Sequence, residues 1–180
     1  MPLTDKESKM LYSIRIGSEN DPKKPEFPPD NPKFPATPTY QIKAPGFTNL
    51  WLKDESKNPT GTHKDRMAWE MVVTYREMLM AKKMGLVKDK LPQMSLITSG
   101  AAGFAIQTML KKYGLPNLKC LVDIDLDERI IHILEKIVCE IYRADLARKP
   151  FHWKEILTLT DNLDGIDITS NDALDPTVKF

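Results

Sequence analysis

The chain has 180 residues, of which 41% are hydrophobic, enough for a core and too many for a wholly disordered protein. Its 26 basic and 25 acidic side chains nearly cancel, which argues against binding to nucleic acid or an anionic membrane through bulk charge. No apolar run reaches the length of a membrane span, and the first residues do not resemble a signal peptide. Cys120 and Cys139 lie in apolar stretches without a C-x-x-C pattern or a metal-ligand spacing, so a cytoplasmic location without a metal site is expected.

Residues 1–47 are expected to form a proline-rich N-terminal arm, separate from an α/β domain over residues 48–180. Eight of the 14 prolines lie between Asp21 and Pro45. Because proline fixes φ and lacks an N–H donor, neither a helix nor a central strand is expected there. Aromatic side chains among the prolines favour an arm docked on a body or on a neighbouring chain over a loose linker; they are Phe27, Phe34 and Tyr40.

Beyond the arm, short apolar strands alternate with amphipathic helices. A strand is expected over residues 49–53, and then a helix over 65–84 that Gly85 ends. The same patterns predict three further strands and three further helices, the strands over 94–98, 118–124 and 139–143, and the helices over 102–113, 127–138 and 153–159. This alternation predicts an α/β fold, an open parallel sheet with helices on both faces.

The first segment that could carry chemistry is Asn-Pro-Thr-Gly-Thr-His-Lys-Asp-Arg, residues 58–66. It is a turn that runs into a helix, and it places Lys64 at the helix N-terminus, where the helix dipole repels cations. Lys64 fits either an ordinary solvated lysine or a lysine whose charge is disfavoured, as an imine-forming amine requires. These residues taken alone favour the solvated lysine.

The second segment is Thr98-Ser99-Gly100-Ala101-Ala102-Gly103, which ends a strand and opens a helix. Its small residues leave the backbone N–H groups of the helix start open to a carboxylate or a phosphate. It matches neither G-x-G-x-x-G nor a P-loop, so nucleotide binding gains no support. A tight turn that needs small residues for packing explains the segment equally well.

Together the two segments resemble the pyridoxal-phosphate enzymes of the tryptophan synthase beta-subunit fold (fold type II). The lysine motif is similar to that of threonine synthases and cysteine synthases, which reads approximately N-P-T-G-S-F-K-D-R. Leu52-Lys53-Asp54-Glu55 resembles the strand that leads into that motif, and residues 98–103 resemble the S-G-N-x-G turn of the family. The resemblance runs from about Thr48 to Asp145, the N-terminal part of such an enzyme.

The resemblance implies that Lys64 forms the internal aldimine with pyridoxal 5'-phosphate and acts as the general base at the substrate α-carbon. It also implies that Thr62 and Ala101 lie beside the cofactor. The carboxylate of a small amino-acid substrate would bind a loop made of Thr98, Ser99, Gly100 and Ala101. The complete enzyme would be a lyase or synthase of amino-acid metabolism, similar to threonine synthase, that eliminates or replaces a group at the β or γ carbon.

Two departures from the family pattern bear on activity. Ala101 stands where the family usually has asparagine beside the ring oxygen of the cofactor, and alanine cannot donate that hydrogen bond. The eight glycines of the sequence include no cluster like the glycine-rich loop with which the family's second domain binds the cofactor phosphate. We therefore expect this chain to lack the C-terminal phosphate domain and to be inactive on its own.

Three explanations of this pattern stay open: a truncated enzyme, a split enzyme completed by a second chain, and a catalytically inactive binding or assembly subunit. Residues 171–176 look like mid-protein sequence, which favours the first two explanations. The expected partners are an amino-acid substrate and either a second copy of the chain or a completing chain. Nucleic acid and membrane are not expected as partners.

Overall fold

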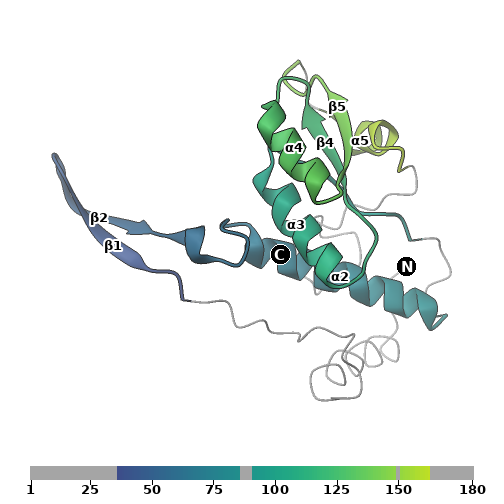
Figure 1. Cartoon of the computed structure of the whole chain (residues 1–180), viewed down its shortest axis with the longest axis horizontal. Coiled ribbons are helices and arrows are strands. Elements are labelled where there is room, and N and C mark those ends of the chain that lie inside the picture. The colour runs from purple at the N-terminus through teal and green to yellow at the C-terminus, as the bar shows by residue number, and fades with distance from the viewer. Residues whose placement is uncertain (1–35, 86–90, 149–150, 163–180) are drawn as a thin grey trace.

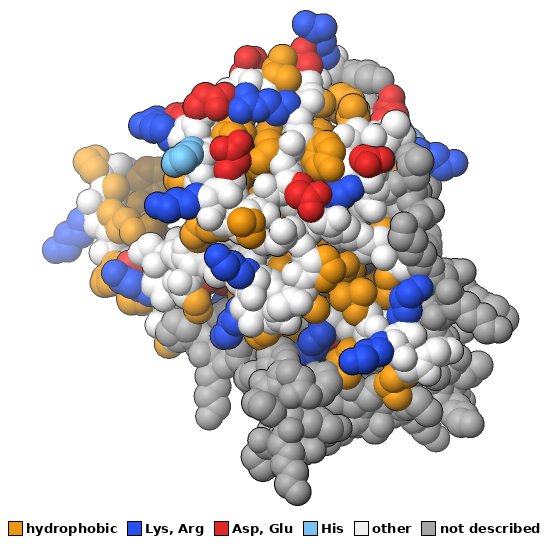
Figure 2. Space-filling model, turned by 45° about the vertical axis from the view of Figure 1, so that its right-hand side comes forward, with side chains coloured by type: hydrophobic (Ala, Val, Ile, Leu, Met, Phe, Trp, Pro, Cys, Tyr) orange, Lys and Arg blue, Asp and Glu red, His pale blue; other side chains and the backbone are white. Residues whose placement is uncertain are grey.

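The computed structural model of the protein describes residues 36–85, 91–148 and 151–162 (Figure 1). Within these ranges a two-stranded antiparallel hairpin projects from a body of helices and a three-stranded parallel sheet. No helix of the described ranges is long and apolar enough to cross a membrane. Figure 2 shows acidic and basic side chains together in the upper part of one face and mainly basic side chains in its lower part.

The hairpin consists of β1 (Thr39–Ala44) and β2 (Phe47–Lys53), joined by a turn in which Gly46 has a φ of +82°. Pro38 and Pro45 lie on either side of β1 and leave its interior free of proline, which is why a strand forms at the end of the expected arm. The expected division at residue 47 falls at the first residue of β2. The preceding part of the arm, residues 1–35, lies outside the described residues.

The hairpin is amphipathic. Tyr40 pairs with Leu52 and Ile42 pairs with Leu50, and residues directly opposite each other share a face, so these four side chains form one apolar face. Tyr40 is 50% exposed and Leu52 is 52% exposed. The opposite face carries Gln41 and other polar side chains, along with Trp51. Two-stranded hairpins are marginally stable without further packing, so we expect this apolar face to pack against another surface.

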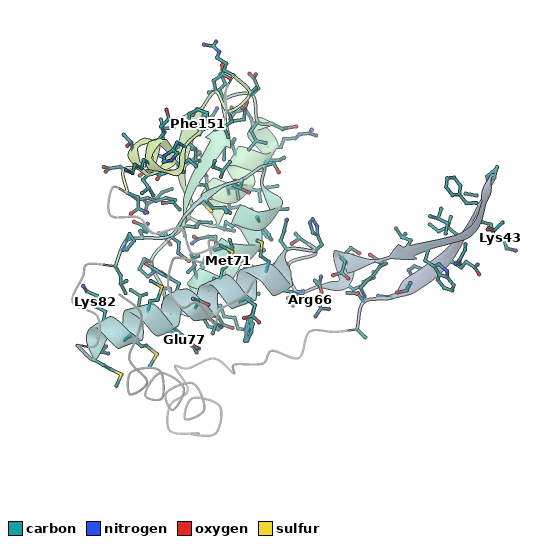
Figure 3. All side chains as sticks on the ribbon, turned by 180° about the vertical axis from the view of Figure 1, so that it is seen from behind. Lys43, Arg66, Met71, Glu77, Lys82 and Phe151 are labelled. Atoms are coloured by element: carbon teal, nitrogen blue, oxygen red, sulfur yellow. The ribbon has the colours of Figure 1, made fainter. Side chains whose placement is uncertain are left out.

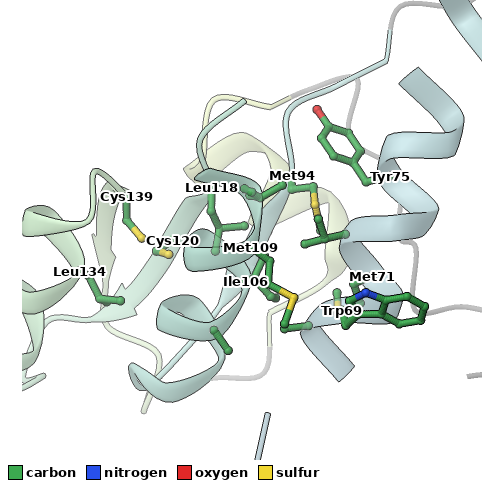
Figure 4. Packing of buried hydrophobic residues seen from close by; sticks show 14 of the residues in the cluster. Trp69, Met71, Tyr75, Met94, Ile106, Met109, Leu118, Cys120, Leu134 and Cys139 are labelled. Atoms are coloured by element: carbon green, nitrogen blue, oxygen red, sulfur yellow. The ribbon is translucent and has the colours of Figure 1, made fainter. Parts of the chain in front are cut away.

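The body is built on two packed helices, α2 (Asp65–Lys83) and α3 (Ala101–Lys112). Both lie within one or two residues of the expected helices over 65–84 and 102–113. Figure 4 shows Trp69, Met71 and Tyr75 of α2 beside Ile106 and Met109 of α3. Met71 and Met109 belong to the core together with Ala68 and Ala105, as their helical spacing indicates, whereas Met67 is exposed.

The parallel sheet has the order β3-β4-β5, with β3 at Ser95–Ile97, β4 at Lys119–Asp123 and β5 at Glu140–Ala144. Helix α4 (Glu128–Lys136) connects β4 to β5, and α5 (Trp153–Leu159) follows β5. The predicted mixed α/β architecture with a parallel sheet is confirmed in the described ranges. These strands and helices lie within about two residues of the predicted ones.

The two faces of the sheet have different surroundings. Cys120 and Val122 of β4 belong to the core shared with α2, α3 and α4, whereas the alternate residue Leu121 is fully buried outside that core. On the Leu121 side, Lys119 Nζ donates to the Asp161 carbonyl oxygen (2.7 Å), just after α5. Figures 1 and 3 show α4 and α5 on opposite sides of the strands.

We expect the isolated chain to self-associate through the apolar face of the hairpin. Leu52→Thr should lower the association constant about tenfold or more, because each copy loses about 1 kcal/mol of apolar burial at a half-exposed leucine. Light scattering over a range of protein concentrations measures the effect. Gln41→Thr, on the other face of the same ribbon, is the matched control, and a concentration-independent monomer of the unmodified chain would contradict the expectation.

Candidate functional site

The lysine segment is a tight turn between a short 3-10 helix, η1 (Glu55–Lys57), and α2. The N–H of Gly61 donates to the carbonyl oxygen of Asn58 (2.8 Å), and Gly61 has a φ of +76°. A left-handed residue at this point reverses the chain, and glycine adopts that conformation without strain. The turn thus brings residues 60 and 62 back over the first turn of α2.

Asp65, the first residue of α2, occupies the centre of this turn and is 0% exposed. Its Oδ2 accepts from the backbone N–H of Thr60 (2.7 Å), and its Oδ1 accepts from the hydroxyl of Thr62 (3.2 Å) and from that of Thr60. A buried carboxylate costs several kcal/mol unless hydrogen bonds replace its water, as they do here. The N-terminal end of the α2 dipole also favours its negative charge.

Lys64 is half-buried and is the N-cap residue of α2, with helical φ and ψ of −83° and −11°. Its backbone N–H donates to Thr62 Oγ1 (3.1 Å). The neighbouring carboxylate of Asp65 faces the turn, and within the described part of the chain the Lys64 ammonium has no ion-pair partner. Lys64 is therefore a cation at a helix start without a compensating anion, the arrangement that the motif indicates.

Glu55 joins the turn to the base of the hairpin. Its Oε1 accepts from the hydroxyl of Thr37 (2.7 Å), and Lys53 Nζ lies 3.4 Å from the same oxygen. Its Oε2 accepts from the side-chain amide of Asn58 (2.7 Å), which also donates to the Thr62 carbonyl oxygen (2.9 Å). Hydrogen bonds from Thr37 and Asn58 lower the pKa of the Glu55 carboxyl, so Glu55 stays ionised at neutral pH.

The second segment is organised by Thr98, which is buried at the end of β3. Its hydroxyl oxygen accepts from the N–H groups of Gly100 (3.0 Å) and Gly103 (3.2 Å). This side chain therefore shapes the loop from beneath, while Ser99 and Ala101 are exposed. Among the described residues, the N–H groups of Ala101 and Ala102 at the start of α3 have no hydrogen-bond acceptor.

Two glycines allow this loop to lie against the core. Gly100 has a φ of +125°, and a Cβ there would come within 2.6 Å of Ile130 Cγ2. A Cβ on Gly103 would lie 3.2 Å from Cys120 Sγ and 3.3 Å from Leu134 Cδ2. A hydrogen bond with Cys139, together with burial, raises the pKa of the Cys120 thiol, so Cys120 is a packing group rather than a nucleophile.

The structure gathers the predicted site residues into two groups. Thr62 and Lys64 belong to the network around Asp65, and residues 98–101 form the loop at the start of α3. The two helices that begin at these groups pack against each other through the core. Within the described ranges no hydrogen bond joins Lys64 to the loop, so the predicted site residues form two separate groups.

Two residues with clear structural roles at the site were not among the predicted site residues. Glu55 clamps the hairpin to the turn, and Asp65 organises the turn from within. The available signal for Asp65 was its spacing from two hydroxyl residues, Thr60 and Thr62. No group of three or more metal-ligating side chains occurs among the described residues.

The residues present fit part of a pyridoxal phosphate site. The Lys64 amine, without an ion-pair partner in the described ranges, suits the aldehyde of the cofactor. The open N–H groups of Ala101 and Ala102 suit an anionic oxygen. The exposed methyl group of Ala101 leaves room at the loop but provides no side-chain donor.

A search of solved structures found proteins that are similar to part of this chain. An O-ureido-L-serine synthase is similar with a TM-score of 0.47 and 24% identity, over 70% of this chain and 37% of its own. An O-acetylserine-dependent cystathionine beta-synthase from Helicobacter pylori is similar with a TM-score of 0.46 and 18% identity, over 62% of this chain and 35% of its own. A pyridoxal 5'-phosphate-dependent aspartate racemase is similar with a TM-score of 0.49 and 19% identity, over 88% of this chain and 42% of its own.

The aspartate racemase is the one of these three whose name states a dependence on pyridoxal 5'-phosphate. The chain spans between 35% and 42% of the length of these three structures. No protein-family model and no curated protein sequence matches the chain.

Gly100→Ala should destabilise the protein by about 2–5 kcal/mol, because backbone strain adds to a clash with Ile130. Urea unfolding followed by circular dichroism measures the loss. Gly114→Ala is the matched control: Gly114 also has a positive φ, +63°, but a Cβ there meets nothing within 4 Å. The control should cost only about 1 kcal/mol. Equal costs for the two variants would show that the loop does not press on α4.

Proposed function

We propose that this chain is the N-terminal part of a pyridoxal-phosphate-dependent amino-acid lyase or synthase that resembles threonine synthase. The proposed reaction is elimination or replacement at the β or γ carbon. One observation carries the proposal: Lys64 is held at the start of α2, while the carboxylate of its neighbour Asp65 accepts hydrogen bonds from Thr60 and Thr62. Within the part of the chain that the structure describes, the Lys64 amine therefore has no salt bridge, which favours covalent binding of an aldehyde.

Lys64, Thr62 and Ala101 each have a role in the proposal. Lys64 would hold the cofactor through its Nζ and move the proton at the α-carbon of the substrate. Thr62 and Ala101 would lie close to the cofactor. Pyridoxal phosphate, when bound, would supply the electron sink for the reaction.

The loop at the start of α3 would bind the carboxylate of the amino-acid substrate. The exposed hydroxyl of Ser99 and the N–H groups of Ala101 and Ala102 are its donors. Thr98 and Gly100 contribute by fixing the loop, since the Thr98 hydroxyl accepts from two backbone N–H groups.

A second chain, or the remainder of a longer one, would complete the enzyme by binding the cofactor phosphate. The proposed fold of the whole N-terminal part is an open sheet with helices on both faces, and the proposed assembly is a homodimer or a complex with the completing chain. The two free thiols are compatible with the proposed cytoplasmic location.

Pyridoxal phosphate followed by borohydride should label Lys64 in preference to the other lysines, as peptide mass spectrometry would show. The isolated chain should bind weakly, because a phosphate without its own loop lacks several charge-assisted hydrogen bonds of about 1.5–3 kcal/mol each. Lys64→Arg should abolish the preferred label, whereas Lys57→Arg, at an exposed lysine of η1 nearby, should leave it unchanged. Label spread evenly over the surface lysines would contradict the proposal.

An inactive binding or assembly subunit is the second candidate, and the exposed alanine at position 101 is the observation that favours it. Ala101→Asn tests whether residue 101 faces the cofactor ring, as the catalytic proposal requires. If the site is catalytic in its complete form, the variant should fold and should shift the absorbance spectrum of the bound cofactor, because a new donor stabilises the ring oxygen as an anion. Lys111→Asn, at the exposed end of the same helix, is the control. An unchanged spectrum would show that residue 101 does not face the ring.

A further inference from the structure

We propose that Thr62 and Asp65 are positioning residues for Lys64, and that the Thr62 hydroxyl is committed to this task rather than to the cofactor. This inference rests on the proposed role of Lys64. It assigns to Asp65 a role that its position next to the lysine does not suggest. It also changes the role of Thr62 from a neighbour of the cofactor to a link between a buried carboxylate and the backbone of the lysine.

The first step concerns the carboxylate of Asp65. Asp65 is fully buried, and its two carboxylate oxygens accept hydrogen bonds from one backbone N–H and two hydroxyl groups. All three donors belong to Thr60 and Thr62, which lie before Lys64 in the chain. The carboxylate therefore holds both Thr60 and Thr62, the residues on either side of Gly61, in the segment that leads to Lys64. Hydrogen bonds to an ionised acceptor are stronger than those between neutral groups.

The second step concerns the direction of the Thr62 hydroxyl. A hydroxyl group has a single proton and two lone pairs. A carboxylate can only accept, so the Thr62 proton is assigned to Asp65 Oδ1 (3.2 Å), which is nearer than the Thr60 hydroxyl oxygen (3.4 Å). The lone pairs are then left to accept, and the backbone N–H of Lys64 donates to one of them (3.1 Å). Thr62 cannot donate to a bound molecule without giving up its bond to Asp65.

The third step concerns the lysine itself. Without Thr62, the backbone N–H of Lys64 would be one of the unsatisfied donors at a helix start. The hydrogen bond to Thr62 Oγ1 satisfies this donor and restrains the backbone of the lysine. This fixes the Cα from which the half-buried side chain leaves the turn. Threonine suits the task better than the serine of the related motif, because its β-branch restricts χ1 and so the direction of the oxygen.

The experiment compares Thr62→Val, Thr62→Ser and the unmodified full chain. Valine keeps the shape and removes the hydroxyl, whereas serine keeps the hydroxyl. Thr108→Val is the matched control, because the Thr108 hydroxyl donates to a backbone carbonyl of α3, that of Phe104 (2.7 Å), at a distance in sequence from the lysine turn. Urea unfolding establishes that each variant is folded before the measurements are compared.

Two readouts are taken. The first is the share of label at Lys64 after incubation with pyridoxal phosphate and reduction with borohydride. The aldehyde carbon bonds to Nζ with loss of water, and borohydride then adds hydride to that carbon while water protonates the nitrogen. The second readout is the hydrogen-exchange rate of the Lys64 amide in the chain without the cofactor, which does not depend on labelling.

Thr62→Val should lower the Lys64 share of the label about three- to tenfold and speed exchange of its amide by a similar factor, the range for one lost hydrogen bond. Thr62→Ser should stay within about twofold of the unmodified chain, since serine keeps the hydroxyl but gains rotamers. Selective labelling that Thr62→Val leaves unchanged would overturn the positioning role alone. A loss that serine does not restore would mark a purely structural effect and would also overturn it. If the unmodified chain shows no selective label, both the proposed function and the positioning role fail.

Discussion

The geometry of the lysine turn depends on one buried charge, the carboxylate of Asp65. A carboxylate removed from water must be fully hydrogen-bonded or it destabilises the fold by several kcal/mol. The chain meets this condition by folding Thr60 and Thr62 back over the first turn of α2, and Gly61 makes that reversal feasible. The same requirement leaves the adjacent Lys64 without its nearest acid. Burial of the Asp65 charge thus leaves the Lys64 amine without an ion-pair partner among the described residues.

The second half of the site is held in place by close packing. Gly103 presses α3 against Cys120 of β4 and Leu134 of α4, so the loop before it has little freedom to shift. Thr98 then uses its hydroxyl oxygen to fix two N–H groups of that loop. Because α2 packs on α3 in the same core, the positions of both helix starts are set by apolar contacts rather than by direct bonds between them.

Helices, strands and the parallel sheet could be predicted from the sequence because apolar periodicity records burial directly, as for Ile106 and Leu110 on α3. The β1 strand was missed because Pro38 and Pro45 lie close together in sequence, and only pairing with β2 makes the residues between them a strand. The lysine motif predicts a cofactor-binding lysine at residue 64, and that role stays a prediction. The inward direction of the Asp65, Thr62 and Thr98 side chains could not be predicted, since it depends on how the turns fold in three dimensions.

Hydrogen bonds of the Glu55 carboxylate connect the base of the hairpin to the lysine turn. One oxygen of this carboxylate accepts from Thr37 at the base of the hairpin, and the other accepts from Asn58 inside the turn. Figure 3 shows the start of α2, marked by Arg66, at the end of the helix nearest the hairpin, with Lys43 near the hairpin tip. Any surface that covers the apolar face of the hairpin would set the orientation of a ribbon whose base is bonded to the turn. The base of the hairpin and the lysine turn therefore share one structural contact, the Glu55 carboxylate.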